Sequence, residues 1–143
     1  MSPSEPLRCV IDVEASGFGK QSYPIEVGWA LPDGRTGCVL VRPPPHWTHW
    51  DEGAERVHGI TRETLRQHGR EPVEVALRMN AELGGQTVYS DAWGHDFAWI
   101  SRLFDEAELP RHFKLEPAAS LFGETLLGQL DEVHTAAFTE LAV

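Results

Sequence analysis

Residues 8–18 read RCVIDVEASGF, and this stretch decides the fold that we expect for the chain. Its first part is a short apolar run with β-branched residues, which is typical of a buried strand, and the Ser-Gly pair after it favours a turn. Side chains two apart leave the same face of a strand. Asp12 and Glu14 are therefore expected side by side at the end of this strand, with Ile11 and Val13 on its opposite face.

Two neighbouring acids at the end of an apolar strand are costly, because each negative charge raises the pKa of the other carboxyl group. A bound Mg²⁺ or Mn²⁺ ion removes this cost, since both ions take carboxylate oxygens as ligands. Taken alone, the pair of Asp12 and Glu14 is equally compatible with a solvated strand end that carries two ordinary acids. A third acid near the pair is needed to favour a metal site.

Outward from this strand, the sequence predicts a sheet flanked by helices. Further strands are expected at 24–31, 36–42, 87–90 and 113–115, and helices at 51–57, 61–67, 72–83, 95–108 and in most of 118–142. An Asp-Gly turn joins the second and third strands, which form an antiparallel meander with the first. A helical crossover follows the fourth strand and favours parallel pairing there. The expected fold class is therefore α/β, with a mixed five-stranded sheet.

The third acid is Asp96, in the segment SDAWGHDF at residues 90–97. It follows a predicted strand and falls in the first turn of a predicted helix, where the helix dipole stabilises a negative charge. The carboxyl ends of neighbouring strands in an open sheet share one crevice, so Asp96 is expected to meet Asp12 and Glu14. Asp91, at the same junction, is interpreted as a turn or capping residue.

With these residues the chain resembles the DEDD superfamily of 3′–5′ exonucleases, which includes proofreading exonucleases, RNase T and oligoribonuclease. The run from Val10 to Phe18 is similar to the family motif Asp-x-Glu-x-[Thr/Ser]-Gly. Three further segments resemble family signatures, in order along the chain: 25–28 (IEVG), 57–61 (VHGIT) and 88–96 (VYSDAWGHD). In the last one, His95 replaces the usual aromatic residue before Asp96. The resemblance spans residues 8–104 and implies a ribonuclease H-like fold.

The resemblance also implies a function, namely metal-dependent hydrolysis of phosphodiester bonds at DNA or RNA 3′ ends. Asp12, Glu14 and Asp96 are then the catalytic residues and hold two divalent ions, Mg²⁺ or Mn²⁺. The residues expected to bind the substrate are Gly17, Phe18 and His58. Phe18 is equally compatible with a place in the core, and His58 with a cap on a turn.

The family's third motif, His-x-x-x-x-Asp or Tyr-x-x-x-Asp, carries the general base, and the sequence shows no match to it. His134 is the nearest candidate, but Thr139 stands five residues later, which favours an ordinary helix position for the histidine. The motif is expected beyond Val143, so that residues 1–143 form a single exonuclease-like domain without its C-terminal helix. Two alternatives stay open: a non-catalytic nucleic-acid-binding or interaction module that kept part of the acid cluster, and a hydrolase of small phosphate esters.

The composition sets the remaining limits. Of the 143 residues, 41% are apolar and 24% are charged, which is typical of a globular protein, and the net charge of −10 argues against a simple basic nucleic-acid binder. The sequence lacks a long apolar stretch and a signal-peptide pattern at its start, so we expect a cytoplasmic protein without a membrane partner. Cys9 and Cys38 are expected to be reduced thiols. The sequence allows a homo-oligomer.

Overall fold

The computed structural model describes residues 7–120, and the observed elements differ from the predicted bounds by two residues or fewer. The strands are β1 (Cys9–Ala15), β2 (Pro24–Ala30), β3 (Thr36–Leu40), β4 (Thr87–Ser90) and β5 (Lys114–Pro117). The helices are α1 (Glu52–His58), α2 (Arg62–His68), α3 (Pro72–Leu83) and α4 (Trp93–Ala107), with a 3₁₀ turn at Ala118–Ser120. No helix in this described part is long and apolar enough to cross a membrane. The helical segment expected at 118–142 lies outside the described residues from residue 121 onward.

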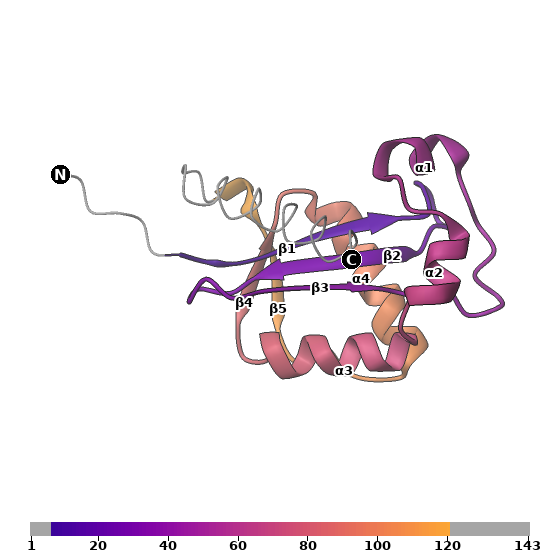
Figure 1. Ribbon diagram of the computed structural model, residues 1–143. Coiled ribbons are helices and arrows are strands. Elements are labelled where there is room, and N and C mark those ends of the chain that lie inside the picture. The colour runs from indigo at the N-terminus through magenta and orange to yellow at the C-terminus, as the bar shows by residue number, and fades with distance from the viewer. Residues whose placement is uncertain (1–6, 121–143) are drawn as a thin grey trace.

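The sheet has the strand order β3-β2-β1-β4-β5. The β1–β2 and β2–β3 pairs are antiparallel, whereas β4 runs parallel to both of its neighbours. This mixed five-stranded sheet confirms the predicted fold class and places β1 at its centre. Figure 1 shows α1 and α2 gathered at the end of the sheet toward which β1 points.

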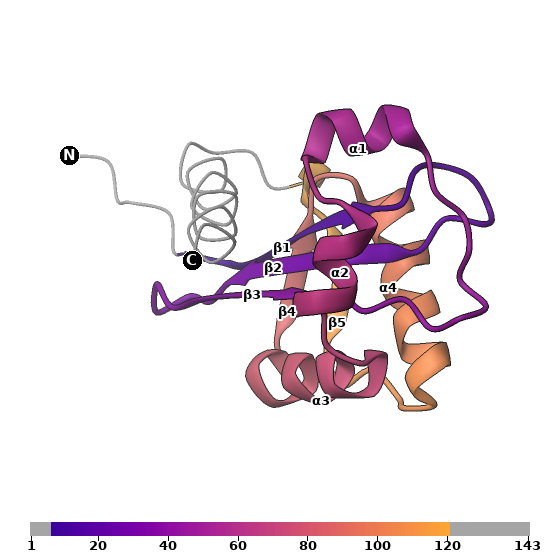
Figure 2. The ribbon, with the colours of Figure 1, turned by 45° about the vertical axis from the view of Figure 1, so that its right-hand side comes forward.

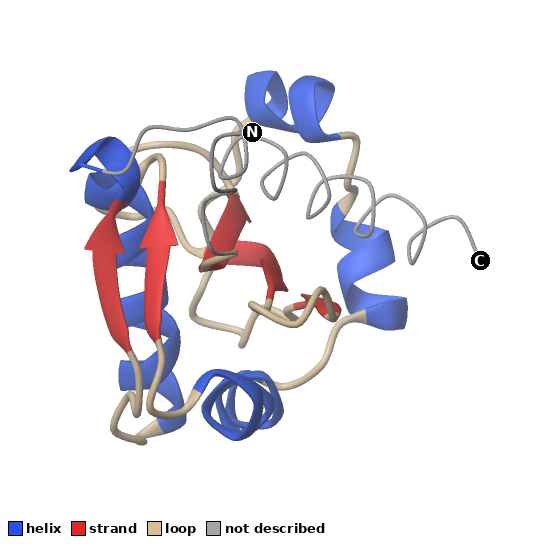
Figure 3. Cartoon of the chain, turned by 90° about the vertical axis from the view of Figure 1, so that its left-hand side faces the viewer, coloured by secondary structure: helices blue, strands red, loops and turns tan. Residues whose placement is uncertain are grey.

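One face of the sheet carries the main hydrophobic core. Alternate residues of β1, including Ile11 and Val13, point into this core. Helices α3 and α4 pack on the same side, as the turned views of Figure 2 and Figure 3 show, with Met79 and Leu103 among their fully buried residues. Val10 belongs to a separate small cluster on the opposite face, so the predicted alternation of β1 is confirmed. By the same alternation, Asp12 and Glu14 leave the sheet on the side of Val10.

Helices α1 and α2 are short, and both begin at a side-chain cap. Asp51 accepts a hydrogen bond from the Gly53 N–H over 2.8 Å at the start of α1. Thr61 accepts one from the Thr64 N–H over 3.1 Å at the start of α2. Such caps satisfy backbone donors that the helix itself leaves unpaired. They explain why the two helices begin where the sequence predicts.

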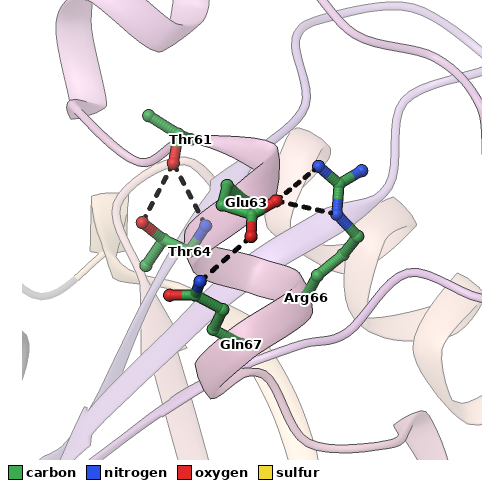
Figure 4. Close-up of polar contacts among 5 residues, drawn as sticks. All are labelled: Thr61, Glu63, Thr64, Arg66 and Gln67. Atoms are coloured by element: carbon green, nitrogen blue, oxygen red, sulfur yellow. Dashed lines mark hydrogen bonds and ion pairs between the residues drawn. The ribbon is translucent and has the colours of Figure 1, made fainter.

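Figure 4 shows the cap of α2 and the polar contacts along its surface. Glu63 accepts hydrogen bonds from both Arg66 and Gln67. Arg66 is therefore paired within a mixed-charge helix surface. On its other side α2 buries Leu65 in the core, whereas α1 buries none of its residues. Helix α1 therefore depends on its caps and on neighbouring loops for its position.

Candidate active site

The parallel pairing of β1 with β4 brings two strand ends together. Val10 lies opposite Tyr89 in this pair, so Asp12 and Asp91, two residues further along each strand, lie at the same edge. Asp96 reaches this edge from the first turn of α4. One carboxylate oxygen of each of the three aspartates lies within 4.8 Å of the other two. We call Asp12, Asp91 and Asp96 the aspartate cluster.

Asp96 is the most enclosed member of the cluster. It is 1% exposed, and the Ser90 hydroxyl donates a hydrogen bond of 2.5 Å to its Oδ2 atom. Burial, with smaller contributions from the charges of Asp12, Asp91 and Glu14, raises the pKa of Asp96 to about 7, although the Ser90 hydrogen bond favours the ionised form. The folded chain therefore places a carboxyl group where it ionises with difficulty unless a positive charge is near.

Glu14 lies in the same pocket but outside the aspartate cluster. The register of β1 and β2 shifts between Glu14 and Ala15, and Glu14 lies opposite Glu26 across the strand pair. Its side chain lines the pocket, and its charge contributes to the raised pKa of Asp96. The sequence predicted that Asp12, Glu14 and Asp96 meet. The structure places the two aspartates in one cluster and the glutamate in the wall beside them.

Asp91 is the member of the cluster that the sequence interpretation assigned elsewhere. It does lie in the turn between β4 and α4, where it is exposed, but its carboxylate also approaches those of Asp12 and Asp96. The sequence signal that identifies Asp91 as a cluster residue is its position at the end of a strand. Asp91 is the first residue after a strand parallel to β1, and the carboxyl ends of parallel strands meet at one edge.

The cluster residues Asp12 and Asp96 line a pocket of about 230 Å³. Helix α4 forms one wall with His95, Asp96 and Trp99, and α1 forms another with Ala54, Val57 and His58. The loop after β1 contributes Gly17 and Phe18. All three residues that the sequence suggested for substrate binding, Gly17, Phe18 and His58, therefore lie at this pocket.

Phe18 lies at the surface of the pocket and not in the core. It is 68% exposed, and its ring meets that of His95 edge-on at 5.1 Å between centroids. His95 in turn stacks on Trp99 at 5.5 Å. These three rings form an aromatic group beside the aspartate cluster, in which Phe18 and His95 are exposed and Trp99 is buried beneath them. A flat ring such as a nucleobase stacks well on a surface of this kind.

Gly17 allows the loop that carries Phe18 to lie close against the segment before α1. A Cβ atom at this position would meet the Asp51 Cβ and the His49 Cε1 atoms at 2.8 Å, which is closer than carbon atoms pack. Ser16 supports the same approach, because its backbone oxygen accepts a hydrogen bond from the Asp51 N–H. The glycine of the Ser-Gly pair is thus required by packing at the pocket.

His58 lines the pocket and carries a buried hydrogen-bond donor. Its Nδ1 atom accepts a hydrogen bond from the Ile60 N–H over 2.9 Å, so the proton of the neutral ring is on Nε2. Within residues 7–120 this Nε2 atom is buried and has no hydrogen-bond partner. Burial also lowers the pKa of His58, which keeps the ring neutral. His58 therefore caps a turn through Nδ1 and also lines the pocket.

The donor set of the pocket fits a hard divalent cation. Within residues 7–120 the three cluster aspartates each offer a carboxylate oxygen, and a cation there would favour the ionised form of Asp96, which burial and, to a smaller extent, the neighbouring acids disfavour. His134, the weak candidate for a general base, lies outside the described residues.

Comparison with known protein families finds no match, and comparison with curated proteins finds none. Solved structures do match the chain. A product-bound exonuclease I aligns with a TM-score of 0.65 at 13% identity, over 80% of this chain and 31% of that protein. Exonuclease I from Methylocaldum szegediense gives a TM-score of 0.64 at 15% identity, over 78% of this chain and 27% of that protein. Exonuclease I from E. coli with a dT13 oligonucleotide gives a TM-score of 0.63 at 13% identity, over 77% of this chain and 27% of that protein.

These likenesses show that the chain has the ribonuclease H-like fold of the exonuclease I structures. They confirm the resemblance drawn from the sequence at the level of the fold. The chain spans less than a third of the length of these neighbours. Their activity, substrates and partners therefore bear on this chain only as grounds for a proposal.

Proposed function

We propose that the chain is a metal-dependent 3′–5′ exonuclease that hydrolyses phosphodiester bonds at the 3′ ends of DNA or RNA. The observation that carries the proposal is the aspartate cluster, which lies at the carboxyl ends of β1 and β4 in a ribonuclease H-like fold. Its members bring three carboxyl groups together, and burial raises the pKa of one of them, Asp96, to about 7. A bound cation would offset the repulsion among these carboxylates.

The acidic residues hold the cation in this proposal. Asp12, Asp91 and Asp96 supply one oxygen each, and Glu14 supplies a further carboxylate from the adjoining wall. When bound, Mg²⁺ or Mn²⁺ ions lower the pKa of the attacking water and neutralise the charge that develops on the departing oxygen. Ser90 fixes the orientation of Asp96 through its hydrogen bond, so that the second oxygen of that carboxylate is available to a ligand.

The other pocket residues position the terminal nucleotide. Phe18 offers an exposed ring on which its base stacks, at about 1–3 kcal/mol for one such contact. The Nε2–H of His58 donates to an oxygen of the sugar or the base, which satisfies a donor that is buried without a partner among residues 7–120. Both residues contact a terminal nucleotide that is single-stranded.

The test follows the shortening of 5′-labelled single strands of DNA and RNA by the whole chain in Mn²⁺. We expect a ladder of labelled products, since a 3′–5′ exonuclease leaves the label on the strand. Asp12→Asn should lower the rate about 10²–10³-fold, because a metal contributes several kcal/mol to the transition state. Asp33→Asn is the matched control. Asp33 lies exposed in the β2–β3 turn, at the opposite end of β2 from the pocket.

A second measurement separates this proposal from a non-catalytic binding module. The assay is repeated from pH 7 to pH 9, because hydroxide needs no protein base and a chain without one should cleave faster as the pH rises. A chain that binds the labelled strand but cleaves none of it over this range in excess Mn²⁺ would contradict the exonuclease proposal. That outcome would favour the binding module.

A further inference from the structure

A second groove continues from the pocket along α4. It has a volume of about 480 Å³ and shares His95 and Trp99 with the pocket. Its other lining comes from the β1–β2 loop, with Gly19 and Lys20, and from the next turns of α4, with Arg102. A ligand that leaves the pocket past His95 therefore enters this groove next.

Two cations line the groove. Lys20 is exposed in the β1–β2 loop, and Arg102 is fixed on α4 opposite it. The Arg102 guanidinium donates hydrogen bonds to the backbone oxygens of Ser22 (2.9 Å) and Lys20 (3.4 Å), and it lies 5.3 Å over the ring of Trp47. These contacts hold the loop and the helix together, so the Arg102 guanidinium and the backbone of Lys20 are already in place before a ligand arrives.

The charge of the groove differs from that of the chain. The chain has a net charge of −10, yet among residues 7–120 the groove lining carries Lys20 and Arg102 against one acid, Asp105. The pocket beside it carries Asp12, Glu14 and Asp96. An anionic strand would thus leave a region that needs bound cations and enter one that supplies its own.

We propose that this groove is the subsite for the nucleotide adjoining the terminal one, with its phosphate between Lys20 and Arg102. The inference rests on the proposed function, because it takes the terminal nucleotide to lie in the pocket. It also names the substrate class more closely. The chain recognises a strand of at least two nucleotides, and a mononucleotide or other small phosphate ester leaves the groove empty.

The experiment measures binding, so that it does not depend on cleavage. Fluorescein-labelled oligothymidylates and oligouridylates of one, two, four and eight nucleotides are titrated with the whole chain in Ca²⁺, and a gel verifies that each strand stays intact. We expect the affinity to rise about tenfold between one and four nucleotides, as a phosphate contact is added. Lys20→Ala should remove most of this rise and should reduce the salt dependence by about one phosphate contact.

The control is Lys114→Ala. Lys20 and Lys114 are the two lysines of the chain, and Lys114 is exposed on β5, outside both the pocket and the groove. Equal affinities for one and eight nucleotides, equal losses in the two variants, or no binding by the wild type would each overturn the inference. Failure of the proposed function is a separate result, namely binding without cleavage in the Mn²⁺ assay.

Discussion

The two walls of the pocket are held in different ways. Helix α4 is fixed by the core, where it buries Asp96, Trp99, Ile100, Leu103 and Phe104. Helix α1 buries no residue, and its pocket-lining Val57 is 87% exposed. The acid with the most perturbed pKa thus lies on a wall that the core holds rigid. The wall that carries His58 depends on local contacts and is expected to open before the rest of the molecule.

The largest expected contrast between the walls is in stability. Leu103→Ala removes a side chain that is 0% exposed and should lower the free energy of unfolding by about 2–5 kcal/mol. Val57→Ala, on the exposed surface of α1, should change the same quantity by about 0.5 kcal/mol or less. Urea unfolding of the two variants measures both values. A loss of more than about 2 kcal/mol for Val57→Ala would mean that α1 is part of the core after all.

The second contrast concerns pH and depends on Asp96. Its raised pKa means that the protonated carboxyl group stabilises the folded chain fully below the ordinary aspartate pKa of about 3.9, and that this stability is lost as the pH rises through about 7. In EDTA the free energy of unfolding of the wild type should therefore fall by up to about 4 kcal/mol between about pH 4 and pH 8 because of Asp96. Asp96→Asn should show none of this fall. Thermal melting of both proteins at several pH values checks the difference.

Metal provides the control for that measurement. Saturating Mn²⁺ favours the ionised carboxylate and should raise the melting temperature of the wild type at pH 8, but not that of Asp96→Asn. The same pH dependence in both proteins would show that Asp96 is not the group responsible. A melting temperature for Asp96→Asn that falls by several degrees at every pH would instead mark the carboxylate as a structural hydrogen-bond acceptor for Ser90.

The sequence was sufficient for the fold because its local signals agree with one another. The alternation around Ile11 and Val13 assigned the two faces of β1 correctly, and Gly34 in the Asp-Gly turn placed the β2–β3 hairpin. Phe18 is different, because an aromatic residue after a turn has no periodic pattern to assign it. Only the packing of the loop left it exposed beside His95.

The site was less predictable, since its details depend on contacts between distant segments. Asp91 could be assigned to a turn correctly and still approach Asp12, because strand pairing decides which turn residues meet. In the described part of the chain, the Nε2 atom of His58 lacks a partner because the other nitrogen accepts the Ile60 hydrogen bond and neighbouring segments bury the ring. Spacing along the chain carries no information on such atoms.

Gly17 offers a smaller test of how the loop between the walls is held. Gly17 and Gly19 both have positive φ values, 155° and 97°, but only at Gly17 would a Cβ atom meet neighbours at 2.8 Å. Gly17→Ala should therefore cost about 1–3 kcal/mol more stability than Gly19→Ala, because Asp51 and His49 must move. Thermal melts of the two variants give the difference. Equal losses of stability in the two variants would show that the segment before α1 moves away from the added Cβ atom at little energetic cost.

The smallest expected effect is also the most direct test of the contrast between rigid and locally held elements. Asp51→Ala and Thr61→Ala remove the same kind of N-terminal cap, worth about 1 kcal/mol, from α1 and α2 respectively. Alanine keeps the Cβ atom of Asp51, so its packing against Gly17 is retained in the variant. The two helices differ in anchoring, since α2 buries Leu65 and α1 buries nothing.

Because α2 is tied to the core, Thr61→Ala should lower the global free energy of unfolding by the full amount of about 1 kcal/mol. Asp51→Ala should lower it by less than about 0.5 kcal/mol, while amide hydrogens in α1 exchange about fivefold faster. Urea unfolding gives the global values, and hydrogen exchange of peptides that cover each helix gives the local ones. If Asp51→Ala instead lowers global stability as much as Thr61→Ala and leaves exchange in α1 unchanged, α1 unfolds together with the core. The two walls of the pocket would then form one cooperative unit, and His58 would be as rigidly placed as Asp96.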